Sequence, residues 1–220
     1  MSETDDHWFD WHRAYDRDDS SLSGRLAIVQ RSLRDALDRC APGPIRVVSM
    51  CAGQGHDLIG ALEDHPRARD VHARLVELHP RNCDAARAGA PSGVEVVCGD
   101  ASMTDAYAGA VPAQIILANG VFGNISDDDI VRTIETLPSL SAPGATVIWT
   151  RHRREPDLTP DIRKWFEAAG FTEVAFVGPD GFVFGVGVNR LVVPPIPFRA
   201  GEQMFEFVGS DQNWENGEPA

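Results

Sequence analysis

The chain has 220 residues and a formal net charge of −13 at pH 7, a length that suits one domain with a full hydrophobic core. The acidic balance argues against nucleic acid or an anionic membrane as a general partner, since both require a broad basic face. The sequence has no apolar run near the roughly 20 residues that span a bilayer, and its acidic N-terminus lacks a signal-peptide core. We therefore expect a cytoplasmic protein that binds neither nucleic acid nor membrane.

The four cysteines, Cys40, Cys51, Cys83 and Cys98, show neither the CxxC spacing nor the Cys/His spacing of a metal site. This pattern indicates reduced thiols, as is usual in the cytoplasm. We expect no structural zinc, no disulfide and no other metal site.

We expect residues 1–44 to form a helical cap or lid on the rest of the chain. Residues 3–19 combine aspartates with aromatic side chains, which is unlike the composition of a plain disordered tail. Apolar residues then recur at steps of three and four from Leu22 to Leu37, which predicts a helix that ends at residues 41–44.

From Ile45 onward, short apolar strands alternate with helix-length segments. The predicted strands cover residues 45–50, 73–77, 94–98, 114–118, 145–150, 172–177 and 182–191. The helices between them include one capped by Ser126 and one opened by Thr159 and Pro160, with Thr159 as the cap. Only residues 178–181 separate the last two strands, too few for a crossover helix, so these strands must be antiparallel.

Repeated strand–helix units define an α/β fold class. We expect a doubly wound, mostly parallel seven-stranded sheet with a C-terminal antiparallel hairpin, in three αβα layers. This core spans residues 45–191, and ligands of such sheets bind at the carboxyl ends of the strands. Residues 192–220 form a C-terminal extension, in which 203–208 is a candidate edge strand and the end is expected to be loose.

A glycine-containing loop follows the first predicted strand. Gly53 and Gly55 let the backbone turn sharply and approach a ligand closely, although an ordinary tight turn would use the same residues. Glu77 ends the second strand, 22 residues past Gly55, which is the spacing at which an acid accepts hydrogen bonds from a ribose diol. The alternative for Glu77 is an exposed carboxylate that leads a helix.

Asp100 follows the third strand directly. Its carboxylate is suited to accept the exocyclic amine of an adenine, and it is equally suited to cap the short segment that follows.

These three features, in this order, resemble those of the class I S-adenosylmethionine (SAM)-dependent methyltransferases. The resemblance covers residues 45–191 and includes the terminal hairpin. It implies SAM as the cofactor, S-adenosylhomocysteine (SAH) as the product, and in-line methyl transfer to a small-molecule acceptor. In such a reaction the protein contributes mainly proximity and alignment, and no metal is expected.

The resemblance also implies which residues contact the cofactor, all of them in loops at the carboxyl ends of strands. These candidates are Ala52, Gly53, Gln54 and Gly55 for the methionine and ribose end, Glu77 for the ribose diol, Leu78 for the adenine ring, Asp100 and Ala101 for the adenine edge, and Asn119 and Gly120 for the methionine part and the acceptor.

The sequence departs from the family pattern at two positions. Ser49 replaces the usual acid late in the first strand, and Cys51 replaces the usual first glycine of the loop. Asp57 is a candidate to neutralise the amino group of the cofactor instead. These departures leave open a non-catalytic SAM- or SAH-binding module with a regulatory role. An NAD(P)-dependent oxidoreductase is less favoured, because Leu58 stands where its fingerprint needs glycine or alanine.

The segment after the fifth strand places three arginines around His152. Arg151 and its neighbours suit an acceptor that carries a carboxylate or phosphate, and His152 is a candidate general base for a hydroxyl acceptor. The alternative is a solvated loop whose arginines pair with residues 127–129 or with Glu155.

Other acceptor contacts are expected on both sides of this segment. The N-terminal segment offers His12 as a second candidate for the base, and its aromatic residues with Tyr15 suit stacking on a flat acceptor. Most of the aromatic residues there are nevertheless expected to pack on the sheet edge. Phe122 and Asn124 lie where the acceptor should arrive, in a segment without the Asn-Pro-Pro-aromatic pattern of enzymes that methylate bases or glutamine. The acceptor is therefore expected to be small and anionic or aromatic, and the sequence leaves the oligomeric state open.

Overall fold

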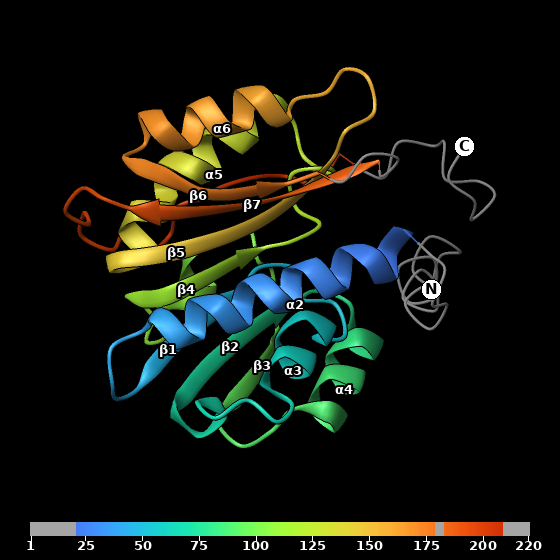
Figure 1. The fold of residues 1–220 in the computed structure, drawn as a ribbon, viewed down its shortest axis with the longest axis vertical. Helices are drawn as coiled ribbons and strands as arrows, with labels where there is room; N and C mark the ends of the chain where they lie inside the picture. Colours follow the sequence, from blue (N-terminus) through green and yellow to red (C-terminus); the bar gives the residue numbers. More distant parts are fainter. Residues whose placement is uncertain (1–20, 179–182, 209–220) are drawn as a thin grey trace.

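Seven strands form one sheet in the order β3-β2-β1-β4-β5-β7-β6 in the computed structural model, which describes residues 21–178 and 183–208 (Figure 1). The strands are β1 Ile45–Ser49, β2 Val71–Glu77, β3 Val94–Cys98, β4 Ala113–Ala118, β5 Ser141–His152, β6 Phe171–Val177 and β7 Phe184–Leu191. Strands β1 to β5 pair in parallel, and β7 pairs antiparallel with both β5 and β6. The predicted mostly parallel seven-stranded sheet with a C-terminal hairpin is confirmed.

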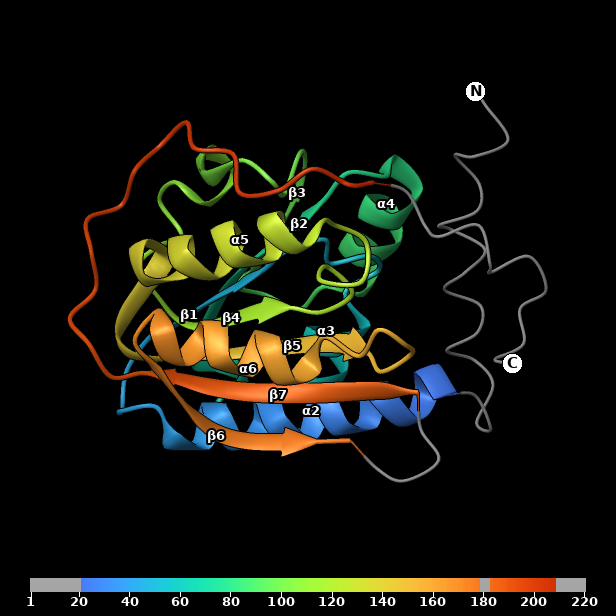
Figure 2. The same cartoon turned by 90° about the horizontal axis from the view of Figure 1, so that it is seen from above.

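Helices cover both faces of the sheet, as the strand–helix alternation predicts (Figure 2). They are α2 Ser21–Arg39, α3 His56–Leu62, α4 Pro80–Gly89, α5 Asp127–Leu140 and α6 Thr159–Ala168, with short 3-10 turns at Ala68–Asp70 and Thr104–Tyr107. Two groups of buried apolar side chains separate the layers. One joins the sheet to α2, α3 and α4, and the other joins it to α5 and α6.

The helix that was predicted from Leu22 to Leu37 is α2. Val29, Leu33 and Leu37 are buried with strand residues that include Val186 of β7, so this helix covers a face of the sheet. His12 and Tyr15 lie outside the described residues.

The two predicted helix caps have different outcomes. The Ser126 side chain accepts a hydrogen bond from the Asp129 amide, which confirms the cap of α5. Thr159 is not the cap of α6, because it is already inside the helix. Oδ1 of Asp157 instead accepts hydrogen bonds from the Thr159 amide at 2.9 Å and from its hydroxyl at 2.7 Å. An aspartate two residues before a helical N–H group can satisfy it in the same way as a threonine cap.

The order of the strands reverses between β1 and β4, and this switch point determines where loops from distant parts of the chain meet. The amide of Met50 donates to the Leu117 carbonyl of β4, and the amide of Ala52 donates to the Val76 carbonyl of β2, both at 2.9 Å. The loop after β1 is therefore held between the two neighbouring strands, at the sheet edge where ligands of doubly wound folds bind.

The described part of the C-terminal extension passes around the outer side of α5 (Figure 2). Met204 donates its amide to the Ser102 carbonyl, and Val208 donates its amide to the Asn124 carbonyl. Gln203 and Phe207 form isolated bridges with Met103 and Ile125, so the edge strand that was predicted over 203–208 is wrong. Its partners are loops that flank α5, and a loop offers no continuous ladder for a strand.

Among the described residues, no helix is long and apolar enough to cross a membrane.

Candidate functional site

The loop after β1 makes its turn through three residues with positive φ, namely Cys51 at 48°, Gly53 at 55° and Gly55 at 77°. A side chain at Gly55 would be strained by this backbone conformation, and its Cβ would lie 2.9 Å from methyl carbons of Ile59 and Leu75. Cys51 holds the same left-handed conformation at a cost of roughly 1–2 kcal/mol for a residue with a Cβ. The loop therefore keeps its shape although a cysteine replaces the usual glycine.

The carboxylate of Glu77 fastens this loop to the end of β2. Its Oε2 accepts the amide of Gly53 at 2.9 Å, and its Oε1 accepts the amide of His79 at 2.9 Å and Nδ2 of Asn82 at 3.5 Å. Glu77 is buried, so the alternative of an exposed carboxylate does not hold. A carboxylate has about four acceptor positions, so Glu77 can accept a further donor while it holds the loop.

Asn82 is a residue that the sequence analysis missed. It is buried in the first turns of α4, where its Oδ1 also accepts from Nε2 of Gln54 at 3.3 Å. Asn82 thus supports both the acid and the loop. Its only sequence signal is its position five residues after Glu77, at the start of the following helix.

The next loops present one exposed apolar side chain and one exposed carboxylate. Leu78 directly follows Glu77 and is 70% exposed. Asp100 is also exposed, and its Oδ1 accepts the Ser102 amide at 2.8 Å, so it closes the turn after β3 as the capping alternative suggests. Ala101 is buried, and its carbonyl accepts the hydroxyl of Tyr107 at 2.7 Å.

At the end of β4, Asn119 contacts the start of α3. Its Nδ2 donates to Oδ2 of Asp57 at 2.8 Å, while its Oδ1 is buried without a hydrogen-bond partner in the described part of the chain. Burial raises the pKa of Asp57, and Arg25, Asn119 and His56 partly oppose this shift. Gly120 donates its amide to Oγ1 of Thr150 on β5 at 2.9 Å, a contact that the sequence did not reveal.

Arg151 and His152 are the last two residues of β5 rather than part of the loop expected after it, and their side chains lie against the loop that follows β4. Nη1 of Arg151 donates to the Phe122 carbonyl at 2.6 Å. A Cβ placed on Gly123 would lie 3.6 Å from Nη1 of Arg151 and 3.6 Å from Cδ2 of His152, so both side chains border this glycine. The structure thus brings Arg151 and His152 at the end of β5 to the backbone of Phe122 and Gly123 in the loop after β4.

The other predicted acceptor residues have structural roles in the described chain. The Phe122 ring is fully buried against Trp149 and Phe166, with ring centroids 6.0 and 6.3 Å away. Its backbone, rather than its ring, is therefore the part that borders the loop. Nδ2 of Asn124 donates to the Gly120 carbonyl at 2.7 Å and so closes the turn.

The alternative, in which the arginines pair with residues 127–129 or with Glu155, does not hold for Arg153. Its side chain pairs with Asp157 at 3.4 Å and also donates to the Gly178 carbonyl. Asp129 pairs instead with Arg132 in its own helix and accepts the amide of Glu206.

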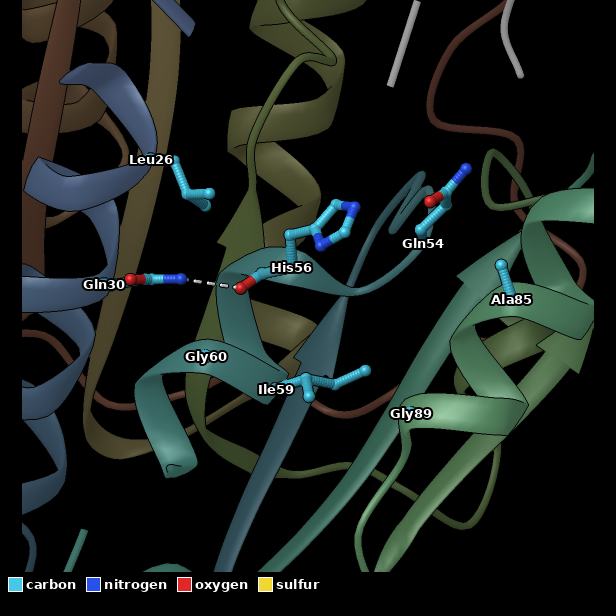
Figure 3. A pocket seen from close by; sticks show the side chains of 8 residues that line it. All are labelled: Leu26, Gln30, Gln54, His56, Ile59, Gly60, Ala85 and Gly89. Carbon is cyan, nitrogen blue, oxygen red and sulfur yellow. Dashed lines mark hydrogen bonds between the residues drawn. The ribbon is translucent and has the colours of Figure 1, made fainter. Parts of the chain in front are cut away.

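A pocket of about 250 Å³ lies beside the glycine loop, between α2, α3 and α4 (Figure 3). Its lining residues are Leu26, Gln30, Gln54, His56, Ile59, Gly60, Ala85 and Gly89. Nε2 of Gln30 donates to the His56 carbonyl at 2.9 Å and joins α2 to α3 at the pocket wall. The lining shares Gln54 with the predicted cofactor contacts but includes neither Glu77 nor Asn119, so the pocket is separate from the strand-end site.

In residues 21–178 and 183–208, histidine, cysteine, aspartate and glutamate side chains form no group of three or more that could hold a metal ion.

No protein-family model matches the sequence, and no curated protein matches it. Its fold does match solved structures. Magnesium protoporphyrin IX methyltransferase (ChlM) from Synechocystis PCC 6803 has 14% identity and a TM-score of 0.64, over 85% of this chain and 92% of that one. The N-methyltransferase NodS from Bradyrhizobium japonicum WM9 has 18% identity and a TM-score of 0.57, over 80% and 99%.

An O-methyltransferase family protein from Burkholderia thailandensis is similar at 16% identity and a TM-score of 0.56, over 84% of this chain and 68% of that one. These similarities, together with the strand order, show that the chain has the class I methyltransferase fold.

Proposed function

We propose that this chain is a SAM-dependent methyltransferase that acts on a small-molecule acceptor. The observation that carries the proposal is the buried Glu77 carboxylate, which holds the Gly53 amide and so fixes the loop at the switch point of the sheet. The solved ChlM structure of the same fold is described with bound SAM, which supports this choice of cofactor.

The side chains present fit a nucleoside that carries an amino acid. Glu77 retains acceptor capacity for a ribose hydroxyl, and Leu78 offers an exposed apolar surface for a flat ring. Asn119 has a buried oxygen without a donor in the described residues, which suits a polar ligand group at the end of β4. The candidate cofactor contacts are retained in this proposal: Ala52, Gly53, Gln54, Gly55, Asp57, Glu77, Leu78, Asp100, Ala101, Asn119 and Gly120.

When bound, the cofactor supplies a methyl group on a sulfonium centre, which is already activated for displacement. The residues of the chain would then contribute alignment. Arg151 would orient an anionic group of the acceptor, and His152 would accept the proton of a hydroxyl acceptor. The position of Gly123 supports this assignment. The side chains of Arg151 and His152 both border this glycine, which has no side chain of its own to cover them.

The proposal includes an acceptor that is small and anionic or aromatic. Arg151, Arg153 and Arg154 form a local basic segment in a chain with a net charge of −13, which suits a small anion better than a polyanion. We also propose a cytoplasmic location, with residues 1–44 as a cap on the 45–191 core and 192–220 as an extension. All four cysteines are free thiols, which supports that location.

A second candidate is a SAM- or SAH-binding module without catalysis. The strained backbone of Cys51 and the uncharged Ser49 favour it, since both depart from the pattern that the fold usually carries at this loop. An oxidoreductase is less favoured, because the fully buried Leu58 occupies the position where a dinucleotide fold needs a small residue for close packing.

Methyl-labelled SAM, incubated with the chain and a panel of small carboxylate, phosphate and phenol acceptors, tests the proposal. A labelled product that depends on Glu77 supports the enzyme. Binding of SAH without any labelled product supports the module instead, and absence of binding by the folded chain refutes both.

A further inference from the structure

Two thiols from separate elements meet beside the end of β2. Cys83 is buried in α4, and its thiol donates to the Glu77 carbonyl at 3.3 Å. Cys98 is exposed at the end of β3, and its thiol donates to the Leu78 carbonyl at 3.8 Å. A side-chain hydrogen bond also links Cys83 to Cys98. The two thiols are therefore neighbours, held by the carbonyls of consecutive residues.

The backbone fixes this proximity. In the parallel ladder between β2 and β3, Cys98 is the register partner of Glu77. The helix that carries Cys83 packs along β3, where Nη2 of Arg87 donates to the Val96 carbonyl at 3.3 Å. One thiol thus comes from the strand beside Glu77, and the other comes from the helix packed against that strand. A disulfide requires such neighbouring backbones, because its geometry does not tolerate distant ones.

We propose that Cys83 and Cys98 form a redox-active pair, which a peroxide oxidises to a disulfide. The sulfur of Cys98 attacks one oxygen of hydrogen peroxide, so that an S–O bond forms, the O–O bond breaks, and a sulfenic acid and one water result. The sulfur of Cys83 then attacks the sulfur of Cys98, so that an S–S bond forms, the S–O bond breaks and a second water leaves. The two thiols together lose two electrons and two protons, and the peroxide is reduced to two waters.

The different surroundings of the two thiols set the order of these steps. Cys98 is exposed and meets the peroxide first, whereas Cys83 is shielded from it. Burial, followed by the hydrogen bond with Cys98 and by its charge, raises the pKa of Cys83 to about 12. Conversion of Cys98 to a neutral sulfenic acid removes that charge, so the proton of Cys83 is easier to remove in the second step.

The pair lies beside residues that the proposed function assigns to the nucleoside, so its effect on ligand binding rests on that function. In the reduced protein the two S–H groups hold the carbonyls of Glu77 and Leu78. A disulfide has no S–H group, so both contacts are lost on oxidation. Asn82, directly before Cys83, also supports the Glu77 carboxylate, so a shift of α4 reaches that group as well. We therefore expect oxidation to weaken nucleoside binding.

Peroxide treatment of the folded protein, followed by digestion without reductant and mass spectrometry, tests the pair. We expect a cross-linked peptide that joins Cys83 to Cys98 within one chain and that dithiothreitol separates. Cys40→Ser is the matched control and should form the same cross-link, because the Cys40 thiol donates to the Ala36 carbonyl instead. Cys83→Ser keeps a donor for the Glu77 carbonyl and should stop at a Cys98 sulfenic acid, which dimedone traps.

Two results would overturn the pair. One is oxidation of Cys98 to a sulfinic acid while Cys83 stays a thiol, and the other is a cross-link between the Cys98 residues of two chains. If Cys83→Ser does not fold, wild-type protein treated with peroxide in the presence of dimedone replaces it. Dimedone should lower the yield of the cross-link, because it competes with Cys83 for the sulfenic acid, and an unchanged yield would contradict the first step.

Calorimetry with SAH measures the consequence for binding. Oxidised wild type should bind SAH at least about threefold more weakly than the reduced protein, and dithiothreitol should restore the affinity. Peroxide should leave the affinity of Cys98→Ser unchanged. An unchanged affinity of the cross-linked wild type would overturn the effect on the site. Absence of SAH binding by the reduced protein would refute the proposed function, while the cross-link still decides on the redox pair.

Discussion

The amide of Gly53 donates a 2.9 Å hydrogen bond to Oε2 of Glu77, and this bond joins the loop after β1 to the end of β2. The two residues are 24 positions apart in the sequence. Because the carboxylate is buried, the bond stabilises the loop more than an exposed pair would. The shape of the site therefore depends on Glu77 even before a ligand arrives.

Glu77→Ala should consequently weaken SAH binding by at least about tenfold, since it removes a ribose acceptor and releases the loop. Hydrogen exchange should show faster exchange of the Gly53 amide in the same variant. Glu95→Gln is the control, because Glu95 is exposed near the start of β3 and pairs with Arg74. Unchanged SAH affinity in Glu77→Ala would contradict the assignment of Glu77 to the site.

Gly187→Ala should destabilise the fold by about 1–3 kcal/mol, because a Cβ there would overlap the ring of Trp149. That ring is fully buried, donates to Oδ1 of Asn189 at 2.8 Å and stacks on Phe166 at 5.7 Å, so it has little room to move. Urea denaturation provides the measurement. Gly89→Ala at the end of α4, where a Cβ meets only an ordinary contact, should be near neutral. Equal stability of the two variants would contradict the packing described for β7.

Asp157→Ala should lower the free energy of unfolding by about 0.5–2 kcal/mol near neutral pH, because it removes the cap of α6. Burial alone would raise the pKa of Asp157, but hydrogen bonds from Thr159 and the nearby Arg153 outweigh it and lower the pKa. A lowered pKa in the folded state stabilises the fold above the unfolded value of about 4, and this contribution is lost as the pH falls through the folded value.

The stability difference between wild type and Asp157→Ala should therefore shrink in acid. Asp157→Asn keeps a capping oxygen and loses the charge, so it should retain most of the stability at neutral pH. A difference that stays constant down to about pH 2 would refute the linkage to this carboxyl.

The cysteines should differ strongly in reactivity. Burial raises the pKa of Cys83 to about 12, together with contributions from Cys98 and Glu77, and burial also raises the pKa of Cys51. Cys98 is exposed. Alkylation near pH 8, followed by peptide mass spectrometry, should label Cys98 at least about a hundredfold faster than Cys51 or Cys83. Rapid labelling of Cys51 in the folded protein would contradict the raised pKa of its thiol.

The order and type of the strands and helices were predictable because the spacing of apolar residues and the composition of turns are local properties of the sequence. The strand at 94–98 has the predicted bounds. The last two strands are antiparallel, as predicted from the four residues 178–181, which are too few for a crossover helix. Strand β5 begins at Ser141, four residues earlier than predicted, since Pro143 and Gly144 indicate a turn. The sheet accommodates them with a register shift between Ala113 and Ile115 on β4, which depends on tertiary pairing.

The candidate site was predictable in part. Gly53 and Glu77 were assigned to one site from their spacing, and the structure brings them into contact. The supporting contacts of Asn82 with Glu77 and of Thr150 with Gly120 depend on how α4 and β5 pack, so no local pattern reveals them. The same is true of Val208, which ties the C-terminal extension to Asn124 across 84 positions of sequence.

Calorimetric titration of the folded chain with SAH tests the central proposal most directly. We expect one binding site with a dissociation constant of about 1 μM, and at least tenfold weaker binding to Glu77→Ala. No detectable binding by folded wild-type protein at about 1 mM SAH, where even a weak site gives a measurable signal, would contradict the proposed cofactor.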